Sequence, residues 1–302
     1  MADVLYAVLK ALQTGYGLNV QTLTRVPGGA DPLAETYRAE TTDGGVYFIK
    51  KTRRPISEVA LKLPAFLHES GLDWVIAPLP AKDGSLSLSL RKTRLIVYPY
   101  VECARAYQRP LTQSQWQALG RMVHCLHEIA APFALPAETY GSEIRDVVAE
   151  QLRTTLPARL EPHRSEVEQL LAEATRLAEH VSKANLPLCI CHTDLHAWNV
   201  VTNEQGQVLL VDWDEVRLAP RERDLMFIGG GVGGPDWCRE PEISWFYEGY
   251  GSVPIDLLAL AYFRCERVLA DIAVAEAHQD LSFQFARGEV AEIALATISR
   301  GK

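Results

Sequence analysis

Two kinds of hydrophobic periodicity divide the chain near residue 100. In the first part, short segments in which apolar and polar residues alternate predict β-strands. These segments are residues 18–26, 35–44, 45–52, 85–90 and 93–101. The sequence Asp43-Gly44-Gly45 predicts a tight hairpin between the second and third of them. We therefore expect a small antiparallel sheet.

Helical periodicity in this part covers residues 1–15 and a segment that runs to Gly71. The second helix is expected to begin with Ser57 as its N-cap and to kink or end early at Pro64. Beyond about residue 108, apolar residues recur at steps of three and four. Helices are predicted over residues 113–130 with Thr112 as cap, 142–156 and 162–184, and near residues 221, 240, 255 and 284. A β-rich segment, residues 187–214, interrupts them.

This pattern predicts an α+β fold with two lobes: a small β-rich N-lobe over residues 1–100 and a larger, mainly helical C-lobe over residues 101–302. The formal net charge of −8 argues against a nucleic-acid partner. An acidic chain suits a cationic small molecule, although this charge could equally serve solubility alone. The sequence leaves monomer and homodimer open.

No apolar run approaches the roughly 20 residues that span a bilayer, so we expect no membrane segment. Asp3 lies where a signal peptide carries positive charge, and a cytoplasmic protein is predicted. The six cysteines are scattered, apart from Cys189 and Cys191. This spacing favours buried, reduced thiols over a zinc site or a disulfide framework.

Candidate chemistry is concentrated between residues 191 and 215. His192, Asp194 and Asn199 form an H-x-D-x(4)-N array, and the strand-like segment VLLVDWDE carries Asp212. The protein-kinase catalytic loop and its metal-binding aspartate have the same order and similar spacing. By this pattern Asp194 orients a hydroxyl and takes its proton, while Asn199 and Asp212 hold Mg²⁺ on a nucleotide. The alternative for Asp194 is a turn residue bonded to backbone.

Residues around this array have predicted supporting roles. Asp214 points to the opposite face from Asp212 if the strand continues. His192 is expected to brace the loop, and His196 either donates to the transferred phosphoryl group or holds the loop in place. Asp224 is expected to accept hydrogen bonds from the backbone of the catalytic loop.

The N-terminal part supplies the predicted nucleotide contacts. Lys50, at the end of VYFIK, is expected to bind the phosphates, with Lys51 on the other face as the alternative. Glu58 is the expected carboxylate partner of Lys50, ahead of Glu69; otherwise Glu58 only stabilises a helix N-terminus. The remaining candidates are Gly28 and Gly29, which either approach phosphate or form a turn, and the backbone of Pro99 and Val101, which would meet adenine.

A segment rich in acidic and aromatic residues is the candidate substrate site. Carboxylates and aromatic rings are the groups that recognise an organic cation. The candidates are Asp236, Trp237, Glu240, Trp245 and Tyr247. The competing interpretation is an ordinary amphipathic helix with buried aromatic residues and a solvated acidic face.

Together these motifs resemble the aminoglycoside phosphotransferase family, small-molecule kinases with the protein-kinase fold, over almost the whole chain. The family commonly has an Asp-Trp pair, as in Asp212-Trp213, and commonly lacks the glycine fingerprint. Residues 211–234 are most similar to its spectinomycin phosphotransferases. The resemblance implies transfer of the γ-phosphate of ATP, with Mg²⁺, to a hydroxyl of spectinomycin, which inactivates the antibiotic. A metabolic kinase for a sugar, amino alcohol or amino acid is the alternative, and a catalytically dead nucleotide-binding protein is disfavoured by the intact motifs.

Overall fold

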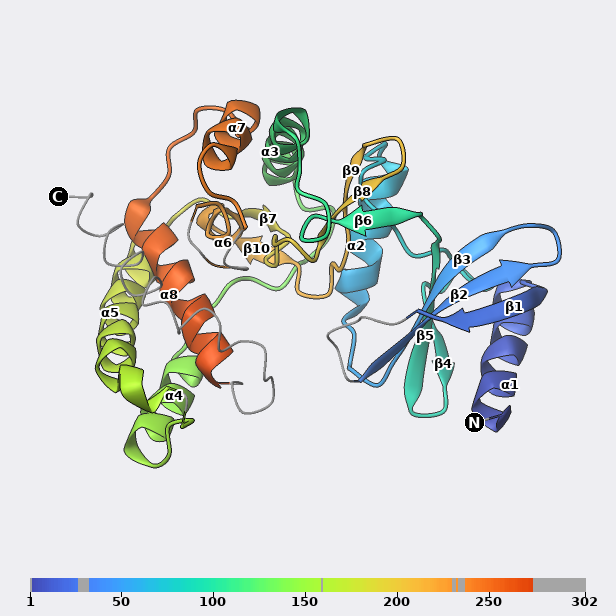
Figure 1. Ribbon diagram of the computed structural model, residues 1–302, viewed down its shortest axis with the longest axis horizontal. Helices are drawn as coiled ribbons and strands as arrows, with labels where there is room; N and C mark the ends of the chain where they lie inside the picture. Colours follow the sequence, from blue (N-terminus) through green and yellow to red (C-terminus); the bar gives the residue numbers. More distant parts are fainter. Residues whose placement is uncertain (1, 27–32, 159, 230–231, 233–236, 274–302) are drawn as a thin grey trace. The chain divides into compact units, whose positions relative to one another are not determined.

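The computed structural model describes residues 2–26, 33–158, 160–229, 232 and 237–273 (Figure 1). The chain forms two compact units. The first comprises residues 1–104 together with 201–214, and the second comprises residues 105–200 together with 215–302.

A five-stranded antiparallel sheet is the centre of the first unit (Figure 1). Its strands, in spatial order, are β1 (Val20–Arg25), β2 (Ala34–Thr41), β3 (Val46–Thr52), β5 (Thr93–Pro99) and β4 (Leu88–Leu90). The predicted hairpin joins β2 to β3, and Gly44 takes a φ of 88°, which a residue without a Cβ adopts at little cost. The alternating segments of the sequence therefore pair as expected.

Two helices cover opposite faces of this sheet. Helix α1 (Ala2–Ala11) continues as a π-helical segment (Leu12–Tyr16), and its side of the sheet buries Val8 and Leu12 against Ile49 and Val97. Helix α2 (Glu58–Glu69) buries its apolar side chains against Ile96 instead. Because successive side chains of a strand point to opposite faces, Lys50 lies on the face of α2.

Helix α2 begins as the sequence predicts, because the Ser57 hydroxyl accepts from the backbone N–H of Val59 at 3.3 Å. The predicted early end at Pro64 does not occur, and the helix continues to Glu69. Pro64 is buried together with Leu61, Leu63 and Leu67. Burial of this apolar face outweighs the single backbone hydrogen bond that a proline removes.

The first unit also includes a segment from much later in the chain. Strands β8 (Val200–Asn203) and β9 (Val208–Leu210) form a three-stranded sheet with β6 (Cys103–Arg105). The backbone N–H of Leu210 donates to the carbonyl of Trp74 at 2.9 Å, and the rings of Trp74 and Trp213 lie 6.5 Å apart. Residues 201–214 therefore belong with the sheet, and the predicted division at residue 100 does not describe them.

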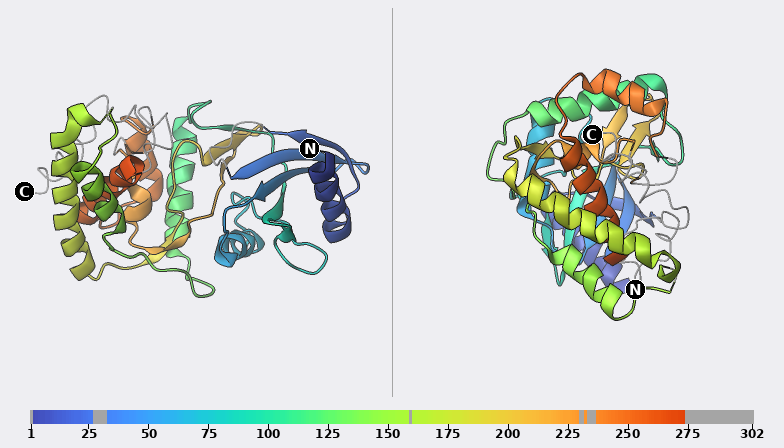
Figure 2. Two further views of the ribbon diagram at one scale, coloured as in Figure 1. Left: turned by 90° about the horizontal axis from the view of Figure 1, so that it is seen from below. Right: turned by 90° about the vertical axis from the view of Figure 1, so that its left-hand side faces the viewer.

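The second unit is mainly helical (Figures 1 and 2). Its helices are α3 (Gln113–Glu128), α4 (Glu143–Arg153), a 3-10 turn (Glu161–His163), α5 (Arg164–Lys183), α6 (Glu222–Leu225), α7 (Glu242–Tyr250) and α8 (Leu257–Ala273). Thr112 and Gln115 form a capping box at the start of α3. Strand β7 (Cys189–Cys191) pairs with β10 (Arg217–Ala219), a strand that the sequence did not predict. The helix expected near residue 284 lies outside the described residues.

Helices α3 and α7 approach each other closely at two glycines. A Cβ on Gly249 would lie 1.9 Å from the carbonyl oxygen of Gln117, and one on Gly120 would lie 2.2 Å from that of Phe246. Side chains larger than glycine would force the two helices apart. Helix α7 is thus a packed element of the second unit.

These observations confirm the predicted α+β class, with an antiparallel sheet in the first unit and a helical second unit. Over the described part of the chain, no helix combines the length and the apolar character needed to cross a membrane.

Candidate active site

Lys50 is held by two aspartates in the first unit. Its Nζ lies 2.7 Å from Oδ2 of Asp214 and 3.4 Å from Oδ1 of Asp212. The expected partner, Glu58, instead accepts from Nη2 of Arg94 at 2.9 Å and is largely exposed. The prediction that Glu58 holds Lys50 was wrong, because Glu58 occupies the first turn of α2 beside Arg94. Among the described residues, Lys50 forms its ion pairs with Asp212 and Asp214 and not with Glu69, the alternative partner.

The turn after β9 explains why both aspartates reach the same lysine. The strand ends at Leu210, and Asp212 has a φ of 68°, in the left-handed region. Strand alternation no longer applies there, so Asp214 does not point away as a continuing strand would require. Lys51 does lie on the other face, where its Nζ pairs with Glu35 at 3.0 Å.

The charges of this cluster depend on one another. Burial by itself lowers the pKa of Lys50, but the two adjacent carboxylates outweigh burial and raise that pKa, so the lysine is a cation at neutral pH. Burial raises the pKa of Asp214, and the neighbouring Asp212 adds to the rise, while Lys50 opposes it. A charged ammonium group held in place on a strand can form charge-assisted hydrogen bonds to phosphate.

Asp194 lies in the second unit, in the loop between β7 and β8. Its Oδ1 lies 3.1 Å from Nε2 of His196 and accepts from Nη1 of Arg267 at 2.9 Å. Its Oδ2 accepts from Nδ2 of Asn199 at 2.8 Å. Burial raises the pKa of Asp194, but the hydrogen bond from His196 and the positive charge of Arg267 shift the pKa below its ordinary value. The carboxyl group is therefore ionised at neutral pH.

His196 is oriented from both sides of its ring. The backbone N–H of Trp198 donates to Nδ1 at 3.2 Å, so Nδ1 is an acceptor and the ring proton is on Nε2. That proton faces Asp194. Of the two predicted roles, the structure supports holding the loop and the base in place.

The side-chain amide of Asn199 donates its hydrogen bonds within the same loop. Nδ2 donates to the carbonyl of Asp194 at 2.9 Å as well as to its carboxylate, which leaves the amide oxygen available as a ligand. Asp212 also remains accessible, with 49% of its side chain exposed. Hard oxygen donors of this kind are ligands that Mg²⁺ prefers, and the binding of Mg²⁺ by these two residues stays a prediction.

The segment before the base is held by Asp224. Its carboxylate accepts from the backbone N–H of His192 at 2.9 Å and from that of Thr193 at 2.6 Å, which are the contacts expected from the sequence. Thr193 has a φ of 71°, an unfavourable conformation for a β-branched residue. Nδ1 of His192 accepts from the backbone N–H of Asp194 at 3.4 Å, which is the predicted bracing role.

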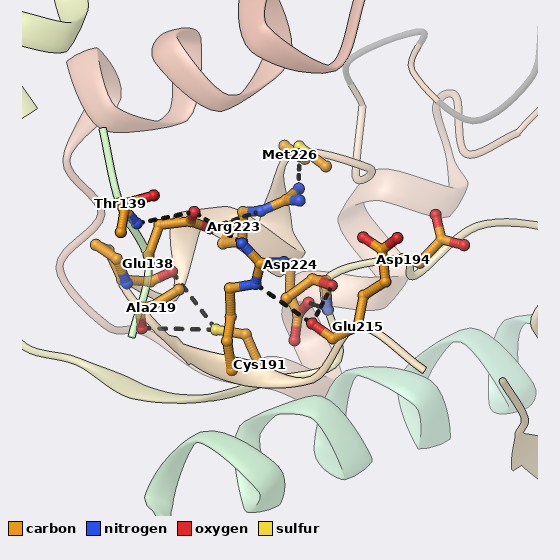
Figure 3. Close-up of polar contacts among 12 residues, drawn as sticks. Glu138, Thr139, Cys191, Asp194, Glu215, Ala219, Arg223, Asp224 and Met226 are labelled. Carbon is orange, nitrogen blue, oxygen red and sulfur yellow. Dashed lines mark hydrogen bonds and ion pairs between the residues drawn. The ribbon is translucent and has the colours of Figure 1, made fainter. Parts of the chain in front are cut away.

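Asp224 belongs to a fully buried chain of polar groups. Nε2 of His127 on α3 lies 3.1 Å from the carboxylate, and Nδ1 of His127 lies 2.8 Å from the hydroxyl of Tyr250 on α7. Burial raises the pKa of Asp224, but the bond to His127 and the charges of His127 and His192 outweigh burial and lower the pKa. Figure 3 shows Asp224 beside Arg223 and Cys191, with Asp194 to one side of them. Local sequence patterns did not single out His127 as a support of the catalytic loop.

Two of the five predicted substrate residues, Trp237 and Tyr247, pack against other aromatic side chains. The side chain of Trp237 is buried at 5% exposure, and its ring lies 4.7 Å from that of Trp116 on α3. Tyr247 contacts the rings of Phe246 and Tyr250. The remaining candidates differ from these: Glu240 is exposed and accepts from Ser244, Trp245 is half-buried on α7, and Asp236 lies outside the described residues. This arrangement favours the amphipathic-helix interpretation, because the aromatic groups pack α7 onto α3.

The other predicted nucleotide contacts are less defined. Pro99 ends β5 opposite Tyr47, and together with Val101 it lines a cavity of about 590 Å³ bordered by α2. Their contacts with adenine stay a prediction. Gly28 and Gly29 lie outside the described residues.

Comparison with known proteins identifies the family. The model of the phosphotransferase enzyme family matches residues 22–251. Spectinomycin phosphotransferase in complex with ADP and spectinomycin has a similar structure, with a TM-score of 0.80 and 32% sequence identity over 97% of this chain and 98% of that one. Choline kinase LicA from Streptococcus pneumoniae shares the fold at 14% identity, with a TM-score of 0.67 over 98% of this chain and 99% of that one.

A curated relative gives a shorter match. Protein StrN of Streptomyces griseus is 26% identical over 210 residues, which span 63% of this chain and 65% of that protein, just under two thirds of its length. The ADP complex of the spectinomycin enzyme agrees with the predicted use of a nucleotide. The family match confirms the predicted resemblance and the predicted class, an ATP-dependent phosphotransferase. The chain therefore belongs to the phosphotransferase enzyme family.

Proposed function

We propose that this protein transfers the γ-phosphate of ATP to a hydroxyl group of spectinomycin or a closely related cationic aminocyclitol. The state of Asp194 carries the proposal: its carboxylate is ionised, held by three side chains and anchored in a loop that Asp224 fixes. Phosphoryl transfer needs a group that orients the attacking hydroxyl and accepts its proton late in the reaction. Asp194 meets that need.

The donor side of the reaction uses Lys50 and oxygen ligands. Lys50 binds the nucleotide phosphates in this proposal, with Asp212 and Asp214 keeping its ammonium charged and in place. Asn199 and Asp212 would hold Mg²⁺ through their side-chain oxygens. When bound, the ion neutralises negative charge on the phosphates.

The acceptor is proposed from similarity and charge. The spectinomycin enzyme is 32% identical over nearly the whole chain, and the chain carries a formal net charge of −8, which suits a cationic substrate. The similarity to choline kinase, at 14% identity, supports the fold alone. A metabolic kinase of the same fold is therefore the alternative function to be tested.

A panel of acceptors tests the proposal. The full-length chain is incubated with ATP and Mg²⁺, and ADP release is measured with spectinomycin, a conventional aminoglycoside, choline, a sugar and an amino acid. We expect release with spectinomycin and a product that is heavier by one phosphoryl group. Activity on a metabolite and none on spectinomycin would reject the proposed substrate while leaving the enzyme class intact.

Two variants, Asp194→Ala and Asp212→Asn, separate the phosphoryl-transfer step from nucleotide binding. Asp194→Ala should lose turnover while ATP still binds, because the base does not hold the nucleotide. Equal, mild effects of Asp194→Ala and Asp212→Asn on turnover and on nucleotide affinity would contradict the assigned roles.

A further inference from the structure

Arg267 contacts the proposed base from a helix that the sequence motifs do not include. It lies on α8, and its Nη1 is 2.9 Å from Oδ1 of Asp194. Its Nε lies 3.2 Å from Oδ1 of Asp271, one turn further along the same helix. Its guanidinium carbon lies 5.5 Å from the ring centre of the buried Phe227. Arg267 is therefore held by an acid and an aromatic ring as well as by the base.

The hydrogen bonds to Asp194 show which oxygen can receive a substrate. An ionised carboxylate has about four acceptor positions, two on each oxygen. Arg267 and His196 take both positions on Oδ1, and Asn199 takes one on Oδ2. One position on Oδ2 is left among the contacts of the described residues. A hydroxyl that donates to Asp194 in this arrangement donates to Oδ2.

We propose that Arg267, oriented by Asp271, is a positioning residue for phosphoryl transfer: it occupies Oδ1 of Asp194 and thereby presents Oδ2 to the substrate hydroxyl. The proposal rests on the proposed function, in which Asp194 is the base. Without Arg267 the carboxylate keeps its contacts with His196 and Asn199 but loses the guanidinium, so it is held less firmly against rotation about its terminal bond, whose torsion is broad. Misplacement of a reacting group by about 1 Å costs on the order of 100-fold in rate.

The chemistry of arginine suits this role better than a single positive charge. A planar guanidinium presents several donors in a fixed fork, so it can contact Asp194 and Asp271 at once, whereas lysine offers one compact ammonium. The charge of Glu215 also acts on Arg267, in addition to the charges of Asp194 and Asp271. The surroundings of the base thus stay acidic, and a cationic substrate is not repelled.

Another arginine provides a matched control. Arg145 on α4 pairs with Glu266, which neighbours Arg267 on α8, and it also donates to the carbonyl of Gly141. It forms a comparable ion pair with α8, and among the described residues it does not contact Asp194. An effect that comes only from anchoring α8 should therefore appear in both arginine variants.

The test compares Arg267→Ala, Arg267→Lys and Arg145→Ala for kcat, KM for ATP, melting temperature and rescue by guanidinium ion below denaturing concentrations. Arg267→Ala should lower kcat by about 10–100-fold, with little change in KM for ATP. Guanidinium should restore part of the lost kcat in that variant and none in Arg145→Ala. Arg267→Lys should fold like the original chain and recover only part of kcat, so a folding failure of the alanine variant would not obscure the result.

Three outcomes would overturn the inference. The first is an unchanged kcat in Arg267→Ala or Arg267→Lys while Asp194→Ala is inactive, which would reject the role of Arg267 alone. The second is a loss of kcat that follows the melting temperature in both arginine variants and is not rescued by guanidinium. The third, full activity in Asp194→Ala, would reject the proposed base and this inference with it.

Discussion

Replacing Asp224 with asparagine tests whether its carboxylate holds the catalytic loop. The two carboxylate oxygens accept from the backbone N–H groups of His192 and Thr193, at 2.9 and 2.6 Å, and one oxygen also faces His127 at 3.1 Å. Asparagine has nearly the same shape but only one oxygen. One of the two backbone N–H groups must then face an NH₂ group, which cannot accept a hydrogen bond.

The expected cost follows from that single unpaired donor. A buried donor left without an acceptor costs about 1–3 kcal/mol. The conformation of Thr193, with a φ of 71°, stores a further strain of about 1–3 kcal/mol that the carboxylate no longer opposes. From the unpaired donor alone, we expect the free energy of unfolding to fall by about 1–3 kcal/mol. We also expect kcat to fall about tenfold or more, because about 1.4 kcal/mol shifts the loop equilibrium tenfold.

Urea unfolding and steady-state kinetics measure the two effects, with Glu222→Gln as the control. Glu222 is buried on the same short helix, and its Oε1 accepts from the backbone N–H of Asp256 at 2.8 Å, a bond that a glutamine oxygen can also accept. The control should therefore lose little stability and no activity. If Asp224→Asn unfolds and turns over like Glu222→Gln, the carboxylate does not hold the loop.

Substitutions at three further positions test other parts of the structure. Lys50→Met should weaken ATP binding about 10–100-fold, from the loss of a charge-assisted hydrogen bond of about 1.5–3 kcal/mol, whereas Lys51→Met should not; equal affinities in a nucleotide titration would refute the assignment of Lys50. Trp237→Ala should cost about 3–5 kcal/mol in the free energy of unfolding, with the substrate KM unchanged; a raised KM at full stability would instead place Trp237 in the substrate site. Gly249→Ala should lower the melting temperature, because its Cβ would lie 1.9 Å from the carbonyl oxygen of Gln117; an unchanged melting temperature would contradict the close packing of α7 on α3.

Local sequence patterns were sufficient for features that depend on neighbouring residues. The alternation in VYFIKK placed Lys50 and Lys51 on opposite faces of a strand, and the structure confirms it. The caps at Ser57 and Thr112 were predicted for the same reason, since capping joins residues two or three positions apart. The spacing of Asp194 and Asn199 likewise indicated one loop, and the two side chains are hydrogen-bonded there.

Long-range partners were decided only by the tertiary structure. Glu58 was expected to hold Lys50 because it is an acid early in the next helix, but the left-handed turn at Asp212 brings two aspartates from more than 160 positions away. Arg267 reaches Asp194 across 73 positions, from a helix whose own pattern indicates only burial. The sequence by itself therefore determined the strands of the N-terminal sheet, the caps and the motif residues, because these follow from backbone periodicity and local hydrogen bonds. The counter-charges and supports of the motif residues were settled by packing, because a buried charge pairs with whichever partner the fold brings within a few ångströms.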